Sequence, residues 1–447
     1  MAEIEPLPRV RALRRAEPVE QFPGANAFVQ AVAGSAFFVD GAPVAVARAP
    51  GRLDVLGGVA DYSGSLVLEL PLRSAALAAA QLRDDGAVVA VSGDRRMTLD
   101  VATLVEEPLA ELAARFAGPT AWGAYVLGGI ALLLREERAA PGGLRVLVSS
   151  DVPQGKGLAS SAAIGVAVLQ AVTACLGRRA EPRRLALISQ QAEQLFADAP
   201  CGSMDQMTAA YGERDHLLLL LCRPAEIVRS IPLPASLVVW GIDSGIRHAV
   251  AGAAYRRARC AAFMGKTLLG CEHEYLAALD PSEVDPDRLP ERMTGAQFLE
   301  GHDGVADPAS TVEPEVVYPV RAATLYPLEE QVRVRAFAEL LAGPITGERA
   351  RLLGELMYES HLGYSRCGLG SPGTDELVAA VRETGWGRGL AGARASAGGS
   401  GGTVVVLGRR DAEPLVRSIA AELGAGFVGG SSSGAASFGV RTLPGRP

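Results

Sequence analysis

A glycine-rich turn carries the clearest chemistry in the sequence. The segment VPQGKGLASSAA, residues 152–163, leaves an apolar strand-like stretch and enters an apolar helical one. Glycine at positions 155 and 157 lets backbone N–H groups come close to an anion, and Ser160 and Ser161 stand at the helix start, where the dipole favours negative charge. The turn predicts a phosphate-binding loop, although an ordinary capped helix has the same local pattern. It is neither a Walker A loop nor a GxGxxG turn, because the required spacing is absent.

Two carboxylates and one arginine are further candidates for chemistry. Asp205 follows a Pro-Cys-Gly turn between Met204 and Met207, an apolar setting that is costly for a charge without a partner or a function. A basic partner is therefore expected, and Arg52 is a candidate because it lies in a glycine-flanked turn, although most arginines lie on the surface. Glu193 lies in an amphipathic helical pattern, where a solvated glutamate is the common alternative to a functional one.

A second glycine-rich loop, SAGGSGGT at residues 396–403, precedes the strand-like stretch TVVVLG. Such loops are often linkers. This one is bounded by apolar runs and lies far from any domain edge, so closing a binding site is an equal alternative.

The elements that must position these residues fall into two groups. Strand patterns fill residues 43–150, and helical patterns follow at 160–176, 183–197 and 202–211, before another strand at 216–222. Strands followed by helices indicate an α+β fold rather than alternating βαβ units. We expect an N-terminal extension at 1–42 with one short helix at 25–33, a first domain at 43–230 and a second at 231–447.

The second group of elements begins with a strand at 237–244 and a long helix at 250–270. Its remaining expected elements are helices at 328–341, 349–363, 374–384 and 412–423, a strand at 403–408 and a final strand at 436–440.

Composition excludes several classes of protein. The 447 residues carry 43 basic and 50 acidic side chains, a net charge of -7, so no basic field is available for nucleic acid. The longest weakly polar stretch, 162–177, is shorter than the ~20 residues that a membrane span needs. The charged N-terminus does not resemble a signal peptide, so a cytoplasmic chain is expected. The six cysteines show no CxxC spacing and predict neither disulfides nor zinc. The oligomeric state stays open.

Four segments in order resemble the GHMP small-molecule kinases, in the galactokinase branch. They are PGRLDVLGGVADYSGSLVL from residue 50, PQGKGLASSAA from 153, PCGSMDQ from 200 and SAGGSGGTVVV from 396. The separations of 32 residues from Ser161 to Glu193 and 12 from Glu193 to Asp205 are similar to those of galactokinases. The resemblance implies a two-domain GHMP kinase fold of the α+β class, with the active site in the cleft between the domains.

The same resemblance implies a role for each candidate residue. Asp205 would be the general base for the anomeric hydroxyl of a sugar, and Arg52 would keep it ionised and stabilise the transferring phosphoryl group. Ser161 and Glu193 would bind Mg²⁺. The residues implied to bind the phosphates of ATP are Gly155, Lys156, Gly157, Leu158, Ala159, Ser160 and Ser161, with Gly398 and Gly399 in the loop that closes the site.

The sugar-binding residues implied by the resemblance are Asp61, which would hold ring hydroxyls, Tyr255, Gly58 and Val59. Galactokinases have Gly-Glu-His-x-Asp-Tyr where this chain has GGVADY at 57–62, and their Glu and His face the exocyclic C6 hydroxyl. Gly58 and Val59 offer no side-chain hydrogen bond there, which favours a sugar without that hydroxyl. L-arabinose has the galactose configuration without the CH₂OH group, and segments at 317–337 and 247–266 resemble plant L-arabinokinases, in their kinase part only.

The sequence thus predicts an ATP- and Mg²⁺-dependent kinase that forms L-arabinose 1-phosphate. The alternatives are a galactokinase, or a kinase for a uronic acid of galacto configuration, for which Arg247 or His248 are candidate partners. A sugar sensor without catalysis is less favoured, since Arg52, Ser161, Glu193 and Asp205 are all present. The expected ligands are a small neutral sugar and ATP.

Three positions leave smaller questions open. Lys156 adds a cation beside the phosphates or points to solvent, and Ala397 stands where the third motif usually has its first glycine. Trp122 and Tyr125 lie near the nucleotide base or, as is commoner for aromatic residues at i and i+3, in a helix core. Anomer and base preference are open.

Overall fold

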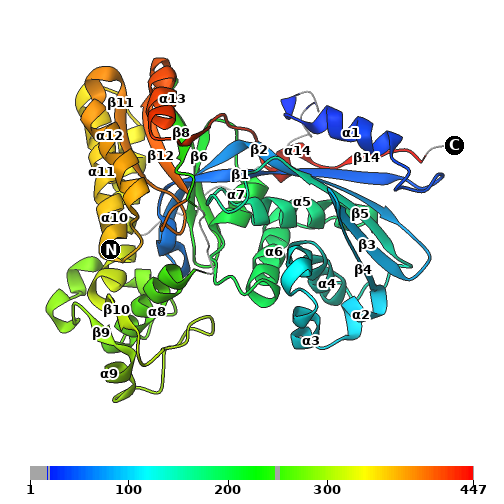
Figure 1. Cartoon of the computed structure of the whole chain (residues 1–447), viewed down its shortest axis with the longest axis horizontal. Coiled ribbons are helices and arrows are strands. Elements are labelled where there is room, and N and C mark those ends of the chain that lie inside the picture. Colours follow the sequence, from blue (N-terminus) through cyan, green and yellow to red (C-terminus); the bar gives the residue numbers. More distant parts are fainter. Residues whose placement is uncertain (1–17, 19–20, 247–251, 446–447) are drawn as a thin grey trace.

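Two β-sheets with helices packed on them organise the chain (Figure 1). The structure is a computed structural model that describes residue 18 and residues 21–246 and 252–445. Arg247 and His248, named above as candidate partners of a uronic acid, lie outside the described residues.

The first sheet in the described part of the chain has eight strands, in the order β14-β1-β2-β5-β3-β4, with β6 paired to β2 and β7 to β6. Its strands are β1 (Val44–Leu56), β2 (Leu66–Leu82), β3 (Ala87–Ser92), β4 (Arg95–Asp100), β5 (Leu144–Ser150), β6 (His216–Leu221), β7 (Glu226–Pro232) and β14 (Arg441–Leu443). The helices of this half are α1 (Ala25–Gly34), α2 (Val101–Glu106), α3 (Leu109–Ala114), α4 (Leu127–Glu136), α5 (Ser160–Cys175), α6 (Pro182–Phe196), α7 (Met204–Tyr211) and α14 (Ala435–Phe438), with 3₁₀ helices η2 (Gly58–Ser63) and η3 (Gly118–Tyr125).

Strands β1 and β2 are longer than the sequence predicts. The glycine-broken stretch after Ala49 continues β1 to Leu56, with a register shift between Pro50 and Arg52 that absorbs the irregular residues. The apolar runs at 66–72 and 75–82 form the single strand β2, whose first part pairs with β6 and whose second part pairs with β5, while Leu72 between them bridges to Ser431.

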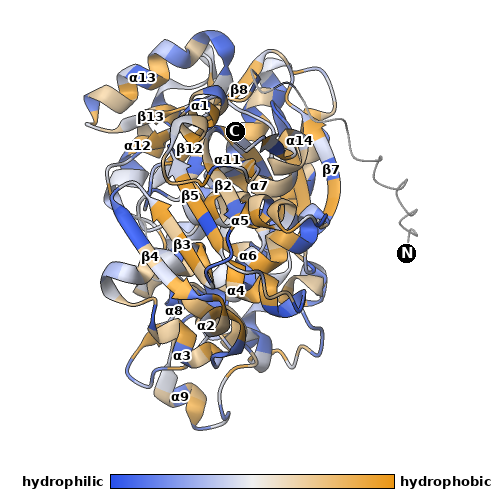
Figure 2. Ribbon diagram, turned by 90° about the vertical axis from the view of Figure 1, so that its right-hand side faces the viewer, coloured by the Kyte–Doolittle hydropathy of each residue, from blue (hydrophilic) through white to orange (hydrophobic). Residues whose placement is uncertain are grey.

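Helices cover both faces of the first sheet, with α1 on one side and α4, α5 and α6 on the other (Figure 1). Helix α5 is buried along most of its length, as expected for an apolar helix against a sheet. The strand β4 at the sheet edge is hydrophilic (Figure 2) and largely exposed, which protects an edge from further pairing.

The described part of the segment before residue 43, from Gln21 onward, packs on the first sheet. Its helix is confirmed as α1, and Phe22, Phe28 and Val32 are buried against β1, β2 and Phe438. The rings of Phe22 and Phe438 meet edge to face, with centroids 4.9 Å apart. The start and the end of the described chain thus share one core on the outer face of the sheet.

The second sheet has four strands in the order β11-β12-β8-β13. Its strands are β8 (Leu237–Asp243), β11 (Leu390–Ala395), β12 (Thr403–Arg409) and β13 (Gly426–Val428). The helices around it are α8 (Ala253–Leu268), α10 (Val320–Leu341), α11 (Gly347–Arg366), α12 (Pro372–Thr384) and α13 (Glu413–Glu422). The smaller elements are β9 (Met293–Thr294), α9 (Gly295–Leu299), β10 (Val317–Tyr318), and 3₁₀ helices η4 (Leu276–Ala278), η5 (Pro281–Glu283), η6 (Pro286–Arg288), η7 (Trp386–Arg388) and η8 (Arg410–Ala412).

Two expected elements of this half differ from the structure. Helix α10 begins at Val320 and runs through Pro327, whereas the sequence predicts a start after that proline. The cost of proline in a helix is offset there because Tyr326 and Leu328 on either side are buried. The final strand expected at 436–440 is the short helix α14, which ends at Gly439 with a positive φ of 67°, and the strand β14 follows it.

The fold is the α+β class predicted from the sequence. The division at residue 230 stays a prediction: β7 extends to Pro232, and β14 returns to pair with β1 in the first sheet. Among the described residues, no helix combines the length and apolar character needed to cross a bilayer.

Candidate active site

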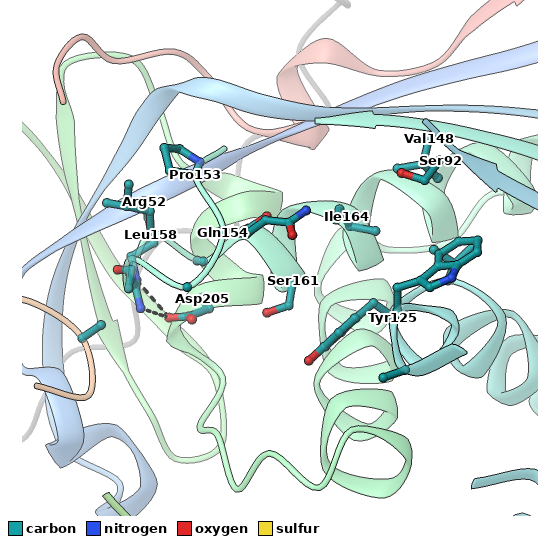
Figure 3. A pocket seen from close by; sticks show the side chains of 18 of the residues that line it. Arg52, Ser92, Tyr125, Val148, Pro153, Gln154, Leu158, Ser161, Ile164 and Asp205 are labelled. Atoms are coloured by element: carbon teal, nitrogen blue, oxygen red, sulfur yellow. Dashed lines mark hydrogen bonds and ion pairs between the residues drawn. The ribbon is translucent and has the colours of Figure 1, made fainter. Parts of the chain in front are cut away.

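Arg52 and Asp205 meet where β1 faces the start of α7 (Figure 3). The Arg52 Nε and Nη2 atoms lie 2.9 and 2.6 Å from Oδ1 of Asp205, and Nη1 donates to the carbonyl of Gly157 at 2.6 Å. The basic partner expected for Asp205 is therefore Arg52. Its guanidinium joins the carboxylate to the glycine-rich turn.

The charge of Arg52 is held in place by several carboxylates. Burial alone would lower its pKa, but Asp205, Glu69 and Asp54 raise the pKa of the guanidinium above its ordinary value. Arg52 is 2% exposed, and its Nε also lies 3.2 Å from Oε2 of Glu69, which is fully buried. Burial and the surrounding carboxylates hold this arginine as a fixed cation beside Asp205.

The glycine-rich turn has the backbone conformation that an anion site needs. Gly155 and Gly157 both have φ near 68°, and Ala159 has φ 59°, so the chain makes several left-handed steps before α5 begins at Ser160. The Ser160 Oγ atom is shielded from solvent and has no hydrogen-bond partner among the described residues. This orphaned hydroxyl at the start of a 16-residue helix fits a phosphate oxygen.

A cavity of about 340 Å³ opens beside this turn (Figure 3). Of the residues predicted to bind phosphates, those that line it are Gly155, Gly157, Leu158, Ala159, Ser160 and Ser161. Arg52 and Asp205 border it as well. Its size lies within the range usual for small-molecule sites.

Trp122 and Tyr125 line the far part of this cavity instead of filling a helix core. Both belong to η3 and are only partly buried. An aromatic wall beside a phosphate loop is suited to stacking on a nucleotide base.

Lys156 pairs with the second sheet in this structure, and its place beside the phosphates stays a prediction. Its Nζ forms an ion pair with Oδ1 of Asp243 at 3.0 Å, and its carbonyl accepts from Thr403 Oγ1 at 2.8 Å. Asp243 ends β8 and Thr403 begins β12. The turn is thereby tied to the second sheet.

Ser161 and Glu193 lie together, as their implied role requires. Ser161 Oγ donates to Glu193 Oε2 at 3.0 Å, and Gln206 Nε2 donates to Oε1 at 2.8 Å. Burial, with the nearby charge of Asp205, raises the pKa of Glu193 to about 7. A hard divalent cation beside these oxygens would restore the ionised form.

These donors fit Mg²⁺. Among the described residues, no group of three or more His, Cys, Asp or Glu side chains is arranged to hold a metal. Mg²⁺ commonly takes one or two protein oxygens and completes its shell with water and phosphate, so a hydroxyl and one carboxylate beside a phosphate loop are sufficient.

A second, smaller cavity of about 20 Å³ lies on the other side of Arg52 and Asp205. All four predicted sugar-binding residues line it: Gly58, Val59, Asp61 and Tyr255. Cys201, Gly202, Met204, Ala397 and Gly398 complete the wall. This volume is well below the range usual for small-molecule sites.

Asp61 is a buried carboxyl on this wall. Burial and the charge of Asp205 raise its pKa to about 7. Gly202 is required beside it, because a Cβ there would overlap the Asp61 carboxylate. Tyr255 is 5% exposed and donates to the carbonyl of Pro200 at 3.0 Å, which fixes its ring in the wall.

The segment 57–59 is held by side chains that sequence reasoning did not single out. The N–H of Gly57 donates to Glu330 at 3.0 Å, that of Gly58 to Asp54 at 3.1 Å, and that of Val59 to Tyr364 at 2.9 Å. All three acceptors are fully buried. Three successive backbone donors are therefore taken by buried acceptors, and neither Gly58 nor Val59 has a side chain that can hydrogen-bond a ligand.

The residues of the second glycine-rich loop, 396–403, occupy several different positions. Ala397 borders both cavities, and Gly398 borders the smaller one. Gly399 packs behind them, since a Cβ there would lie 2.9 Å from the Tyr364 ring and 2.6 Å from the carbonyl of Leu369. No signal in the local sequence separates these roles, because they depend on contacts with α11.

Comparisons with known proteins agree with this arrangement. The family model "GHMP kinases N terminal domain" matches residues 124–213. A galactokinase of Roseiflexus sp. (strain RS-1) is 30% identical over 84% of this chain and 86% of its own length. The chain belongs to the GHMP kinase family. As a GHMP kinase it is a phosphotransferase. The turn at 152–163 and the Arg52–Asp205 pair lie in the segments that carry the resemblance.

Other relatives place this GHMP kinase in the galactokinase branch. A protein of Arabidopsis thaliana named L-arabinokinase is 37% identical over 81% of this chain, and the chain spans 42% of that protein's length. The crystal structure of Lactococcus lactis galactokinase complexed with galactose has the same fold, with a TM-score of 0.71 at 18% identity over 90% of this chain and 95% of the other. Methanococcus jannaschii mevalonate kinase shares it more distantly, with a TM-score of 0.57 at 13% identity over 87% of this chain and 98% of the other.

Proposed function

We propose that this GHMP kinase transfers the γ-phosphoryl group of ATP to the anomeric hydroxyl of L-arabinose, with Mg²⁺, giving L-arabinose 1-phosphate. The observation that carries the choice of sugar is the cavity wall at Gly58 and Val59. Side chains offer no hydrogen bond there, and the three N–H groups of 57–59 are taken by buried acceptors.

Such a wall suits a sugar whose facing edge is apolar. A hydroxymethyl group pressed against it would lose its hydrogen bonds to water without replacement, at a cost of roughly 1–3 kcal/mol. The pyranose ring of L-arabinose has the galactose configuration and lacks that group. The name of the Arabidopsis relative supports the same sugar.

The catalytic roles follow from the geometry of the pair. Asp205 takes the proton of the anomeric hydroxyl as that oxygen attacks phosphorus, and Arg52 stabilises the charge that develops beside it. The turn at 155–161 holds the phosphates, with Ser160 Oγ as a free donor. Ser161 and Glu193 would hold Mg²⁺, which when bound neutralises charge on the phosphates.

Two other functions are less well supported. A galactokinase would fit the Roseiflexus relative, but the hydroxymethyl group of its sugar would find no side-chain hydrogen bond at Gly58 and Val59. A uronic acid would need a cation, and Arg52 is the only Lys or Arg that borders the smaller cavity among the described residues. A sensor without catalysis is disfavoured by the assembled pair of Arg52 and Asp205.

The test is a panel of sugars incubated with the purified protein, ATP and Mg²⁺, with ADP release as the rate and phosphorus NMR as the product assay. We expect turnover with L-arabinose and a phosphate on its anomeric carbon. Phosphate on any other carbon would remove the role given to Asp205, and turnover restricted to a uronic acid would remove the choice of sugar.

A further inference from the structure

Two buried side chains each bind both the wall of the smaller cavity at residues 58–59 and the second glycine-rich loop at 396–403. Asp54, on β1, accepts the N–H of Gly58 through Oδ1 at 3.1 Å and the N–H of Ala397 through Oδ2 at 2.8 Å. Tyr364, on α11, accepts the N–H of Val59 at 2.9 Å and donates its hydroxyl to the carbonyl of Ala397. We call these two side chains the Asp54–Tyr364 clamp.

The clamp is rigid because a third buried residue supports it. Arg394 lies 3.1 Å from Asp54 Oδ2 through Nη1, and its guanidinium stacks 4.8 Å from the centre of the Tyr364 ring. All three side chains are 0% exposed. The hydroxyl of Tyr364 uses its donor and an acceptor site at once, and a Cβ on Gly58 would overlap it. Neither side chain can turn away without leaving buried polar groups unpaired.

Ala397 makes the clamp relevant to both cavities. It borders the larger cavity beside the phosphate turn and also the smaller cavity lined by Gly58 and Val59. Both of its backbone polar groups are bound by the clamp. A displacement of Gly58 and Val59 is therefore passed to the wall of the nucleotide cavity.

We expect sugar binding to displace this wall. The smaller cavity, at about 20 Å³, is well below the range usual for small-molecule sites. Since the clamp bonds one wall to Ala397, the loop 396–402 adopts its sugar-bound position before any nucleotide arrives. The converse holds when a nucleotide fixes this loop first, because coupling between sites is reciprocal.

We propose that Tyr364 and Asp54 are positioning residues that couple the two cavities, so that each ligand raises the affinity for the other. This inference rests on the proposed function only in taking the two ligands to be a sugar and a nucleotide. It does not depend on which sugar the enzyme uses. Tyr364 provides one half of this coupling through its hydroxyl, and the conservative substitution Tyr364→Phe removes that hydroxyl.

The experiment measures the dissociation constant of MgADP by calorimetry, alone and with saturating L-arabinose or D-galactose. We expect the sugar that turns over best to tighten MgADP binding in the wild type by about fivefold or more, the lower end of typical coupling. In Tyr364→Phe, the factor by which sugar tightens MgADP binding should fall below about twofold, while the dissociation constant of MgADP without sugar changes little. The reciprocal titration of sugar with and without MgADP must give the same factor.

Tyr326→Phe is the matched control. Tyr326 is also buried, at 2% exposure, and its ring lies 5.4 Å from that of Tyr364, but its hydroxyl makes only 3.4 Å contacts with Gly57 and Ser360. We expect this variant to keep the wild-type factor. If Tyr364→Phe keeps it too, or if the wild type shows no coupling with any sugar it phosphorylates, the proposal is wrong.

Hydrogen exchange on the wild-type protein tests the same coupling without relying on a variant that must fold. MgADP alone should slow exchange of the Gly58 and Val59 amides, which belong to the sugar wall, while amides of α1 stay unchanged. Unaltered exchange at 58 and 59 would overturn the coupling. If L-arabinose is not the substrate, the enzyme will turn over another sugar instead, and the coupling between that sugar and MgADP can still be measured.

Discussion

Arg52 binds Asp205 through two of its nitrogens, at 2.6 and 2.9 Å, and the carbonyl of Gly157 through the third, at 2.6 Å. One buried guanidinium thus connects the proposed base to the phosphate turn. Asp205 and the turn are thereby held in a fixed position relative to each other.

Replacing Asp205 should separate binding from turnover. Asp205→Asn keeps the size of the side chain and removes the base, so kcat should fall by about 10²–10⁴. The dissociation constant of the sugar should change by only a few fold. Asp198→Asn, an exposed carboxylate paired with Arg256 at 2.7 Å, is the control and should stay within about twofold of wild type. A turnover number of Asp205→Asn near wild type would exclude Asp205 as the base.

The Mg²⁺ requirement should depend on Glu193. Glu193→Gln removes the one buried carboxylate bonded to Ser161, so the Mg²⁺ concentration for half-maximal rate should rise by about tenfold or more. The measurement is a Mg²⁺ titration at saturating ATP and sugar. Glu69→Gln is the control, because Glu69 is also buried but contacts Arg52 instead. Equal Mg²⁺ curves for Glu193→Gln and wild type would rule out this carboxylate as a ligand.

Trp122 should report on nucleotide binding. Base stacking on an aromatic side chain is worth about 1–3 kcal/mol, so Trp122→Ala should raise KM for ATP by about 5-fold to 100-fold and leave KM for the sugar unchanged. Trp386→Ala, at a tryptophan in η7 beside Arg409, is the control. Steady-state kinetics with each substrate varied decides this, and a rise confined to the sugar KM would contradict the position given to the base.

Local chemistry explains what could be predicted from the sequence. The phosphate turn and the start of α5 are encoded within a dozen residues, so their geometry follows from glycine positions and helix rules. The pair of Arg52 and Asp205 was expected from the apolar setting of the aspartate. Arg52 was one arginine among many, and the resemblance to a family was needed to choose it as the partner of Asp205.

The contacts that could not be predicted join distant parts of the chain. Val59 and Tyr364 are 305 positions apart, and Asp54 and Ala397 are 343 apart. No periodicity or spacing indicates such pairs, since they arise only when α11 and the second sheet pack on β1. The burial of Phe22, Phe28 and Val32 could not be predicted for the same reason. These residues pack against Phe438, which lies near the opposite end of the sequence.

The raised pKa of Asp61 predicts how stability varies with pH. Its pKa is about 7 in the fold against an ordinary 3.8, so between these values the unfolded chain releases a proton that the folded chain keeps. The stability associated with this group is complete below pH 3.8 and is lost as pH rises through 7. Asp61→Asn lacks this loss, so its melting temperature relative to wild type should rise by a few degrees from pH 5 to pH 8. A difference that stays constant over this range would contradict the burial of a titrating carboxyl.

Val59 should set the size of sugar that the smaller cavity accepts. Val59→Ala removes two methyl groups from a residue that is 3% exposed and lines this cavity. The preference for L-arabinose over D-galactose should fall by about tenfold, the scale of one methylene in an apolar pocket. Val55→Ala removes the same atoms from a buried residue of β1 that borders neither cavity, and should leave the preference unchanged. Equal shifts in both variants would assign the effect to general loosening.

The ratio of kcat/KM for L-arabinose to that for D-galactose, measured with the purified wild-type protein at saturating ATP and Mg²⁺, tests the central claim most directly. The lack of side-chain hydrogen bonds at Gly58 and Val59 predicts a ratio of about 10 or more in favour of L-arabinose. A ratio below 1 would contradict the assignment and would make the enzyme a galactokinase.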